Sequence, residues 1–136
     1  MKSIELAPDS INYDLECDCL SVQFIDGKYE FSKEIGSVIL DFGTELDGDT
    51  LVPLGFEIID ASTVFGCKKS SLTKNFLREM SIRLKISDKI VLSIQLMTLV
   101  RNQKLEKSVN AIGVNSSNIP GIDLGFNASG IGSVTA

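Results

Sequence analysis

Apolar and polar residues alternate along much of the chain, which is the pattern of strands that bury one face. The longest such stretch runs through residues 80–86 and resumes over residues 90–100. A three-residue loop at Ser87–Lys89 places Leu84 opposite Leu92, so that both lie on the buried face. We therefore predict an antiparallel hairpin with this register.

A second alternating stretch surrounds Asp26-Gly27 in the first half of the chain. This dipeptide favours a two-residue hairpin turn, because such a turn needs positive φ at both central positions. A hairpin over Leu20–Phe31 would pair Phe24 with Tyr29 and keep its apolar side chains on one face. Turn chemistry and hydrophobic pattern thus predict the same structure.

Three further strands and a helical region complete the prediction. The strands cover Ser37–Phe42, Leu51–Ile59 and, after a turn at Asn102-Gln103, Leu105–Val114. Between Leu51–Ile59 and the hairpin that begins at residue 80, the sequence is typical of helix. The expected features are N-caps at Asp60 or Ser62, a stop at Gly66 and a second helix from about Ser70 to Glu79.

The order of these elements predicts an α+β fold, with a mostly antiparallel sheet (a β-meander) and one helical region between two β-rich halves. The 136 residues are the size of one compact domain. Residues 13–66 would form a meander with a short helix, and residues 67–136 a helix with a hairpin or meander extension. The Gly-, Asn- and Ser-rich end of the chain predicts a flexible tail at about residues 130–136.

Charge is divided unevenly along the chain. Residues 1–66 contain 14 acids and 3 bases, a net charge of −11, whereas residues 67–136 contain 4 acids and 10 bases, a net charge of +6. All ten of these bases lie between Lys68 and Lys107. Such a division is typical of a surface that interacts with a partner, or of two parts of the protein that complement each other.

Several classes of active site lack their residues in this sequence. There is no histidine, which removes Ser-His-Asp and Cys-His arrangements and most transition-metal sites. The three cysteines are too few for a four-ligand zinc site, and we expect Cys17 and Cys19 to be free, buried or half-buried thiols. No apolar run reaches the length of a signal peptide or membrane span. These features predict a cytoplasmic protein without cofactor or metal and without enzymatic activity.

Acidic residues open the first β-rich half at alternate positions. Asp14, Glu16 and Asp18 have the same parity as Leu20 and would share its core face in one straight strand. A calcium loop that begins at Asp14 lacks the required glycine and glutamate at its sixth and twelfth positions. We therefore expect Asp14 to bind backbone N–H groups in a turn before the strand, and Asp18 to lie near solvent at the rim of the core.

The same segment resembles a known family. Tyr13-Asp14, Glu16, Asp18, Leu20 and Val22 are similar to the opening block of the family called domain of unknown function 2283. Val38–Asp41 and Leu54–Ser62 resemble its two later blocks, so the resemblance covers residues 13–66 only. It implies a small β-meander followed by a helix, and it implies no activity or catalytic residues.

Two groups of charged residues are candidates for binding. The candidate acidic rim consists of Asp14, Glu16, Asp18, Asp41 and Asp60, and the candidate anion-binding surface of Lys68, Lys69, Lys74, Arg78, Arg83 and Lys85. The first hypothesis is a non-enzymatic interaction or regulatory module that binds itself or another protein through its charged surfaces. The alternative is binding of an anion or nucleic acid through residues 68–107, and no membrane partner is expected.

Overall fold

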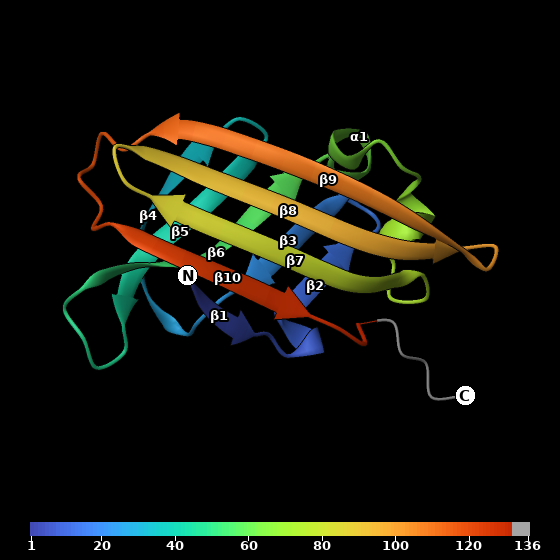
Figure 1. Ribbon diagram of the computed structural model, residues 1–136, viewed down its shortest axis with the longest axis horizontal. Coiled ribbons are helices and arrows are strands. Elements are labelled where there is room, and N and C mark those ends of the chain that lie inside the picture. The colour runs from blue at the N-terminus through green and yellow to red at the C-terminus, as the bar shows by residue number, and fades with distance from the viewer. Residues whose placement is uncertain (132–136) are drawn as a thin grey trace.

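Two five-stranded β-sheets pack face to face in the computed structural model, which describes residues 1–131. Sheet A contains, in spatial order, β1 (Lys2–Glu5), β10 (Ile122–Ala128), β7 (Leu77–Ile86), β8 (Lys89–Val100) and β9 (Gln103–Val114). Sheet B contains β2 (Ile11–Asp14), β3 (Cys19–Gln23), β6 (Leu51–Ile59), β5 (Val38–Glu45) and β4 (Gly27–Ile35). Sheet A lies in front of sheet B in Figure 1, and the strands of the two sheets cross at a wide angle.

The prediction of an α+β fold is wrong, because the described residues form an almost entirely β structure. Their helical elements are the 3₁₀ turns η1 (Pro8–Ser10) and η2 (Lys69–Leu72) and the helix α1 (Ala61–Phe65). Residues 73–79, expected to be helical, form a turn and the start of β7. The helix-like spacing of Leu72, Phe76 and Leu77 does not reflect one helix face. Leu72 is buried in η2 and Leu77 is buried in β7, whereas Phe76 is 37% exposed. No helix in residues 1–131 has the length and apolar character that a membrane crossing requires.

The predicted hairpin at Asp26-Gly27 is also wrong. β3 pairs with β2 and β6, and β4 lies at the far edge of sheet B, so Phe24 and Tyr29 are not partners. The backbone N–H groups of Phe24 and Ile25 both donate to the Leu54 carbonyl oxygen, which keeps the chain beside β6. Long-range pairing thus overrides the local turn signal, and β3 to β6 form a Greek key in place of a meander.

Glycine serves two different purposes around β4. Gly27 has no positive φ; a Cβ there would lie 2.5 Å from the Thr44 carbonyl oxygen and 2.6 Å from Leu54 Cδ2. Close approach of the neighbouring strand therefore explains this glycine. The tight turn lies at Gly36, whose φ is +58°, and it sets Ile35 opposite Val38.

Several predicted features are confirmed. The strand over Leu51–Ile59 is present with these bounds, and Leu84 lies opposite Leu92 as the three-residue loop requires. The turn before β9 is one residue earlier than predicted, at Arg101-Asn102, where φ is positive at both positions.

The strands β1, β2 and β10 were not predicted. Of the predicted flexible tail, residues 132–136 lie outside the described residues.

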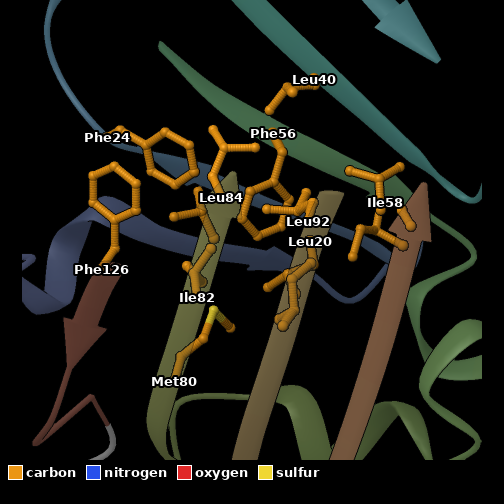
Figure 2. Close-up of a cluster of buried hydrophobic side chains, with 14 of the residues drawn as sticks. Leu20, Phe24, Leu40, Phe56, Ile58, Met80, Ile82, Leu84, Leu92 and Phe126 are labelled. Carbon is orange, nitrogen blue, oxygen red and sulfur yellow. The ribbon is translucent and has the colours of Figure 1, made fainter. Parts of the chain in front are cut away.

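The hydrophobic core fills the space between the two sheets. Leu84 and Leu92 of sheet A face Leu20 and Phe56 of sheet B in Figure 2, and each is at most 1% exposed. Along β7 the buried residues alternate with the outward-facing polar residues Ser81, Arg83 and Lys85. The outer faces of both sheets therefore carry many of the polar side chains of the strands.

Candidate functional site

Asp18 lies at the centre of a buried hydrogen-bond network and is only 5% exposed, contrary to the expectation that it lies near solvent. Its Oδ1 accepts hydrogen bonds from the Tyr13 hydroxyl at 2.6 Å and the Ser62 backbone N–H at 3.0 Å. Its Oδ2 accepts one from the Ser62 hydroxyl at 2.6 Å, and its carbonyl oxygen accepts one from the Ala61 N–H at 2.9 Å. Asp18 thus caps α1 from a segment distant in sequence.

The turn between β2 and β3 explains why an acidic run precedes core residues. Asp14 pairs with Cys19 on the outer face, whereas Tyr13 pairs with Leu20 on the inner face. Asp18 has a φ of +55°, in the left-handed region. The strand is therefore not continuous through this position, and residues before and after the turn need not share a face at alternate positions. Asp14 Oδ1 accepts the Glu16 backbone N–H at 2.9 Å, so the predicted turn role of Asp14 is confirmed.

Sequence reasoning missed Tyr13 and Ser62 as partners of Asp18. Ser62 is 44 residues from Asp18 in the sequence. Asp60 occupies the N-cap position of α1, but the Asp18 side chain makes the capping hydrogen bond. Asp60 has a φ of +55° and makes no side-chain capping bond. The absence of that bond is visible only in the structure, so no local pattern could have identified the remote cap.

The stability of the protein is expected to fall when Asp18 becomes protonated. Burial would raise the pKa of the Asp18 carboxyl, but hydrogen bonds from Ser62 and Tyr13 outweigh it and hold the pKa below its ordinary value. The carboxylate therefore stabilises the fold above the unfolded-state pKa of about 3.9, and this contribution is lost as pH falls through the folded-state pKa. Denaturation should show a steeper loss of stability below about pH 4 for the wild type than for Asp18→Asn. Parallel pH profiles of the two proteins would contradict this assignment.

The other residues of the predicted acidic rim do not converge on Asp18. Asp41 lies in the middle of β5, where Oδ1 accepts the Ser32 hydroxyl at 2.6 Å. Glu16 and Asp60 are exposed. No group of three or more Cys, Asp or Glu side chains within residues 1–131 is arranged to hold a metal ion.

The three cysteines are free, but Cys17 is exposed, so the expectation that it is buried or half-buried is wrong. Cys19 is half-buried, and its thiol donates a hydrogen bond to the Cys17 carbonyl oxygen at 3.3 Å. A side-chain hydrogen bond with Cys17, together with burial, raises the pKa of Cys19 to about 11. Burial likewise raises the pKa of Cys67. Raised pKa values keep both thiols protonated near neutral pH, which disfavours a nucleophilic role.

The predicted anion-binding surface divides into two separate groups. Lys68, Lys69 and Lys74 lie in the connection between α1 and β7. Arg83 lies five residues beyond Arg78 on β7, which is about 17 Å along a strand. The Arg83 guanidinium also forms an ion pair with Asp123 at 3.3 Å. Lys85 follows Arg83 on the same outer face, so these two bases belong to a different surface.

Positive charge gathers instead around the end of sheet A where β7 begins. η2 packs against β8, α1 packs against β9, and the Leu99 N–H donates to the Phe76 carbonyl oxygen at 2.8 Å. These contacts bring the α1–β7 connection beside the turn between β8 and β9 (Figure 1). The exposed bases there, which we call the basic corner, are Lys68, Lys69, Lys74, Arg101 and Lys104.

The outer face of sheet B has the opposite charge. Glu57 lies in a row with Ile39 and Glu34, and Asp41 lies in the adjacent row. Asp14 is in the row on the other side of Glu57, beside Cys19 and Ile59. These three paired rows contain no lysine or arginine. We call Asp14, Glu34, Asp41 and Glu57 the acidic face.

Two curated proteins are similar to this chain over most of their length. One, from Methanosarcina mazei, carries the name "Putative hypoxanthine phosphoribosyltransferase"; it is 30% identical over 110 residues, which cover 80% of this chain and 84% of that protein. The other is an uncharacterised protein of Methanocaldococcus jannaschii, 30% identical over 106 residues, which cover 78% of this chain and 87% of that protein. No family model matches the chain, and no solved structure matches it at a significant level.

Proposed function

This chain belongs to the family of these M. mazei and M. jannaschii proteins, and we propose that it is a non-enzymatic module that binds a second copy of itself through oppositely charged surfaces. The observation that carries the proposal is that the acidic and the basic side chains form two separate surfaces on different parts of the fold. The acidic face lies on sheet B, whereas the basic corner belongs to sheet A and the connection before it. Complementary surfaces of this kind accelerate association and set the orientation of the partners.

The proposed contact joins two different surfaces, so it is heterologous. The acidic face of one copy would meet the basic corner of another, which leaves the basic corner of the first copy and the acidic face of the second copy unused. Association should therefore continue beyond a dimer as protein concentration rises. Exposed charges are screened within about 10 Å at ~0.1 M salt, so added salt should weaken the contact.

The average mass in solution is expected to decrease with increasing salt. Light scattering coupled to size-exclusion chromatography, at ~0.05 M and ~0.5 M salt and several protein concentrations, measures this directly. The triple variant Lys68→Glu, Lys69→Glu, Lys74→Glu should remain monomeric at low salt. Lys89→Glu, an exposed change on β8 outside the basic corner, should behave as the wild type. A monomer mass at every salt and protein concentration would refute the proposal.

Binding of an anion or nucleic acid at the basic corner is the alternative, favoured by the same group of bases. A titration with labelled RNA and DNA across salt concentrations separates the two functions. The alternative would be favoured if the wild type binds nucleic acid, the triple variant does not, and the protein stays monomeric at every salt concentration. No binding at low salt would exclude it.

An enzymatic function is the remaining candidate, and the name of the M. mazei relative is the observation that favours it. That name states transfer of a phosphoribosyl group to hypoxanthine. Incubation of the full chain with hypoxanthine and phosphoribosyl pyrophosphate, followed by chromatography for the nucleotide product, tests this activity. Turnover that scales with protein concentration and survives repurification would displace the non-enzymatic proposal.

A further inference from the structure

The outer face of sheet A contains a groove with a volume of about 530 Å³. No helix within residues 1–131 covers this face, which points toward the viewer in Figure 1. One row of polar side chains crosses the sheet along the groove. Each residue of this row is paired with the next one on the neighbouring strand. The row consists of Glu5, Asn127, Ser81, Gln95 and Ser108. With strands about 4.8 Å apart, it spans about 19 Å.

The side chains of this row are available to a ligand. Within residues 1–131, the amides of Asn127 and Gln95 and the hydroxyls of Ser81 and Ser108 make no side-chain hydrogen bond to the protein. On sheet B the situation differs, because Ser32 donates to Asp41 at 2.6 Å. The groove therefore presents a series of groups that both donate and accept hydrogen bonds.

The distribution of charge indicates which ligands fit. Glu5 lies at one end of the row, while Glu79 and Glu106 lie in the next row on either side of Met97. The two flanking carboxylates are thus two strand spacings, about 10 Å, apart. Lys107 also lines the groove, so its margins carry three carboxylates and one ammonium group, whereas Asn127, Ser81 and Gln95 keep the centre uncharged.

These features favour one class of ligand over two others. Phosphates and other anions would meet the carboxylates at the margins. A cation would bind the marginal carboxylates, but it would leave the amide N–H donors at the uncharged centre without an acceptor. Ligand hydroxyl groups satisfy both regions, because they donate to carboxylates and exchange hydrogen bonds with amides. The groove volume lies within the range of about 300–1,000 Å³ that is typical of small-molecule sites.

We propose that this groove binds a neutral ligand rich in hydroxyl groups, a short oligosaccharide that lies across the strands of sheet A. Asn127, Ser81 and Gln95 form the central hydrogen bonds, and Met97 supplies an apolar contact beside them. Glu79 and Glu106 accept hydrogen bonds from hydroxyls at the margins of the ligand. This site is separate from the acidic face and from the basic-corner lysines that the self-association test alters.

The test uses the full chain at ~0.5 M salt, where charge-driven self-association is screened. A panel of neutral tetrasaccharides of glucose, xylose and mannose is added at this salt. Spermidine and a sulfated tetrasaccharide are the charged probes and are tested at ~0.05 M salt as well, because high salt would screen their binding. Amide signals of β7, β8 and β10 are followed by NMR. At least one neutral sugar should shift the signals of Ser81, Gln95 and Asn127, whereas neither charged probe should. No shift with any neutral sugar, or shifts with spermidine alone, would overturn the proposal.

Matched amide variants distinguish the groove from the rest of the face. Asn127→Ala and Gln95→Ala should each weaken sugar binding about tenfold, the effect of losing a hydrogen-bonding group at a well-formed site. Asn110→Ala removes an exposed amide from β9, two residues beyond Ser108 and outside the groove lining, and should leave the affinity unchanged. An equal loss in Asn110→Ala would place the binding elsewhere and refute the assignment. Circular dichroism confirms that each variant is folded.

Discussion

Replacement of Asp18 by alanine is expected to lower the free energy of unfolding by about 3–4 kcal/mol, because hydrogen bonds to a charged group contribute about 1.5–3 kcal/mol each and are not additive. The substitution removes the acceptor of the Tyr13 hydroxyl and of both Ser62 donors. Ser62 is only 9% exposed, so water has little room to replace the carboxylate. The buried donors are left unsatisfied, and the first turn of α1 loses its cap.

Urea denaturation of the wild type, Asp18→Ala and Asp18→Asn measures this contribution. The asparagine keeps one acceptor oxygen near the Ser62 and Tyr13 donors, so it should be less destabilising than alanine. Glu16→Gln is the matched control, because Glu16 is exposed in the same turn and its side chain makes no hydrogen bond within the described residues. It should change stability by less than about 0.5 kcal/mol. Equal stabilities of Asp18→Ala and the control would show that the network does not support the fold.

Alternation of apolar and polar residues was sufficient to predict the β7–β8 hairpin. The β7–β8 register followed from the need to keep Leu84 and Leu92 on the buried face, a local constraint. Asp26-Gly27 failed as a hairpin signal because β3 finds its partner in β6, more than 25 residues later. β10 was missed because the Gly-, Asn- and Ser-rich composition around it is typical of a loop, although apolar residues alternate through Ile122–Ala128 and both Phe126 and Ala128 are buried.

The candidate sites were less predictable than the strands. Asp18 was singled out as a residue of interest, but the network around it depends on a contact between the β2–β3 turn and α1 that no sequence spacing reveals. The charge division was visible in the sequence, whereas its arrangement as a face and a corner depends on which strands share a sheet. The groove row joins residues from β1, β7, β8, β9 and β10, and only the register of sheet A brings them together.

Phe126→Ala is expected to destabilise the protein by about 3–5 kcal/mol, the usual loss for truncation of a buried aromatic residue. Phe126 is 1% exposed, and its ring stacks on Phe24 with centroids 4.0 Å apart and planes 5° apart (Figure 2). Phe126 belongs to β10 of sheet A, whereas Phe24 follows β3 of sheet B. The truncation therefore opens a cavity between the two layers.

A double-mutant cycle tests whether this aromatic pair holds the two sheets together. Phe24→Ala and Phe126→Ala combined should cost less than the sum of the single variants, with a coupling of about 0.5–1.5 kcal/mol for the lost ring contact. Tyr29→Ala is the aromatic control, since Tyr29 is 61% exposed and should contribute little. Strict additivity would mean that the rings do not touch in solution. Because β10 also supplies Asn127 to the groove, a misplaced β10 would remove the physical basis of the proposed sugar site as well.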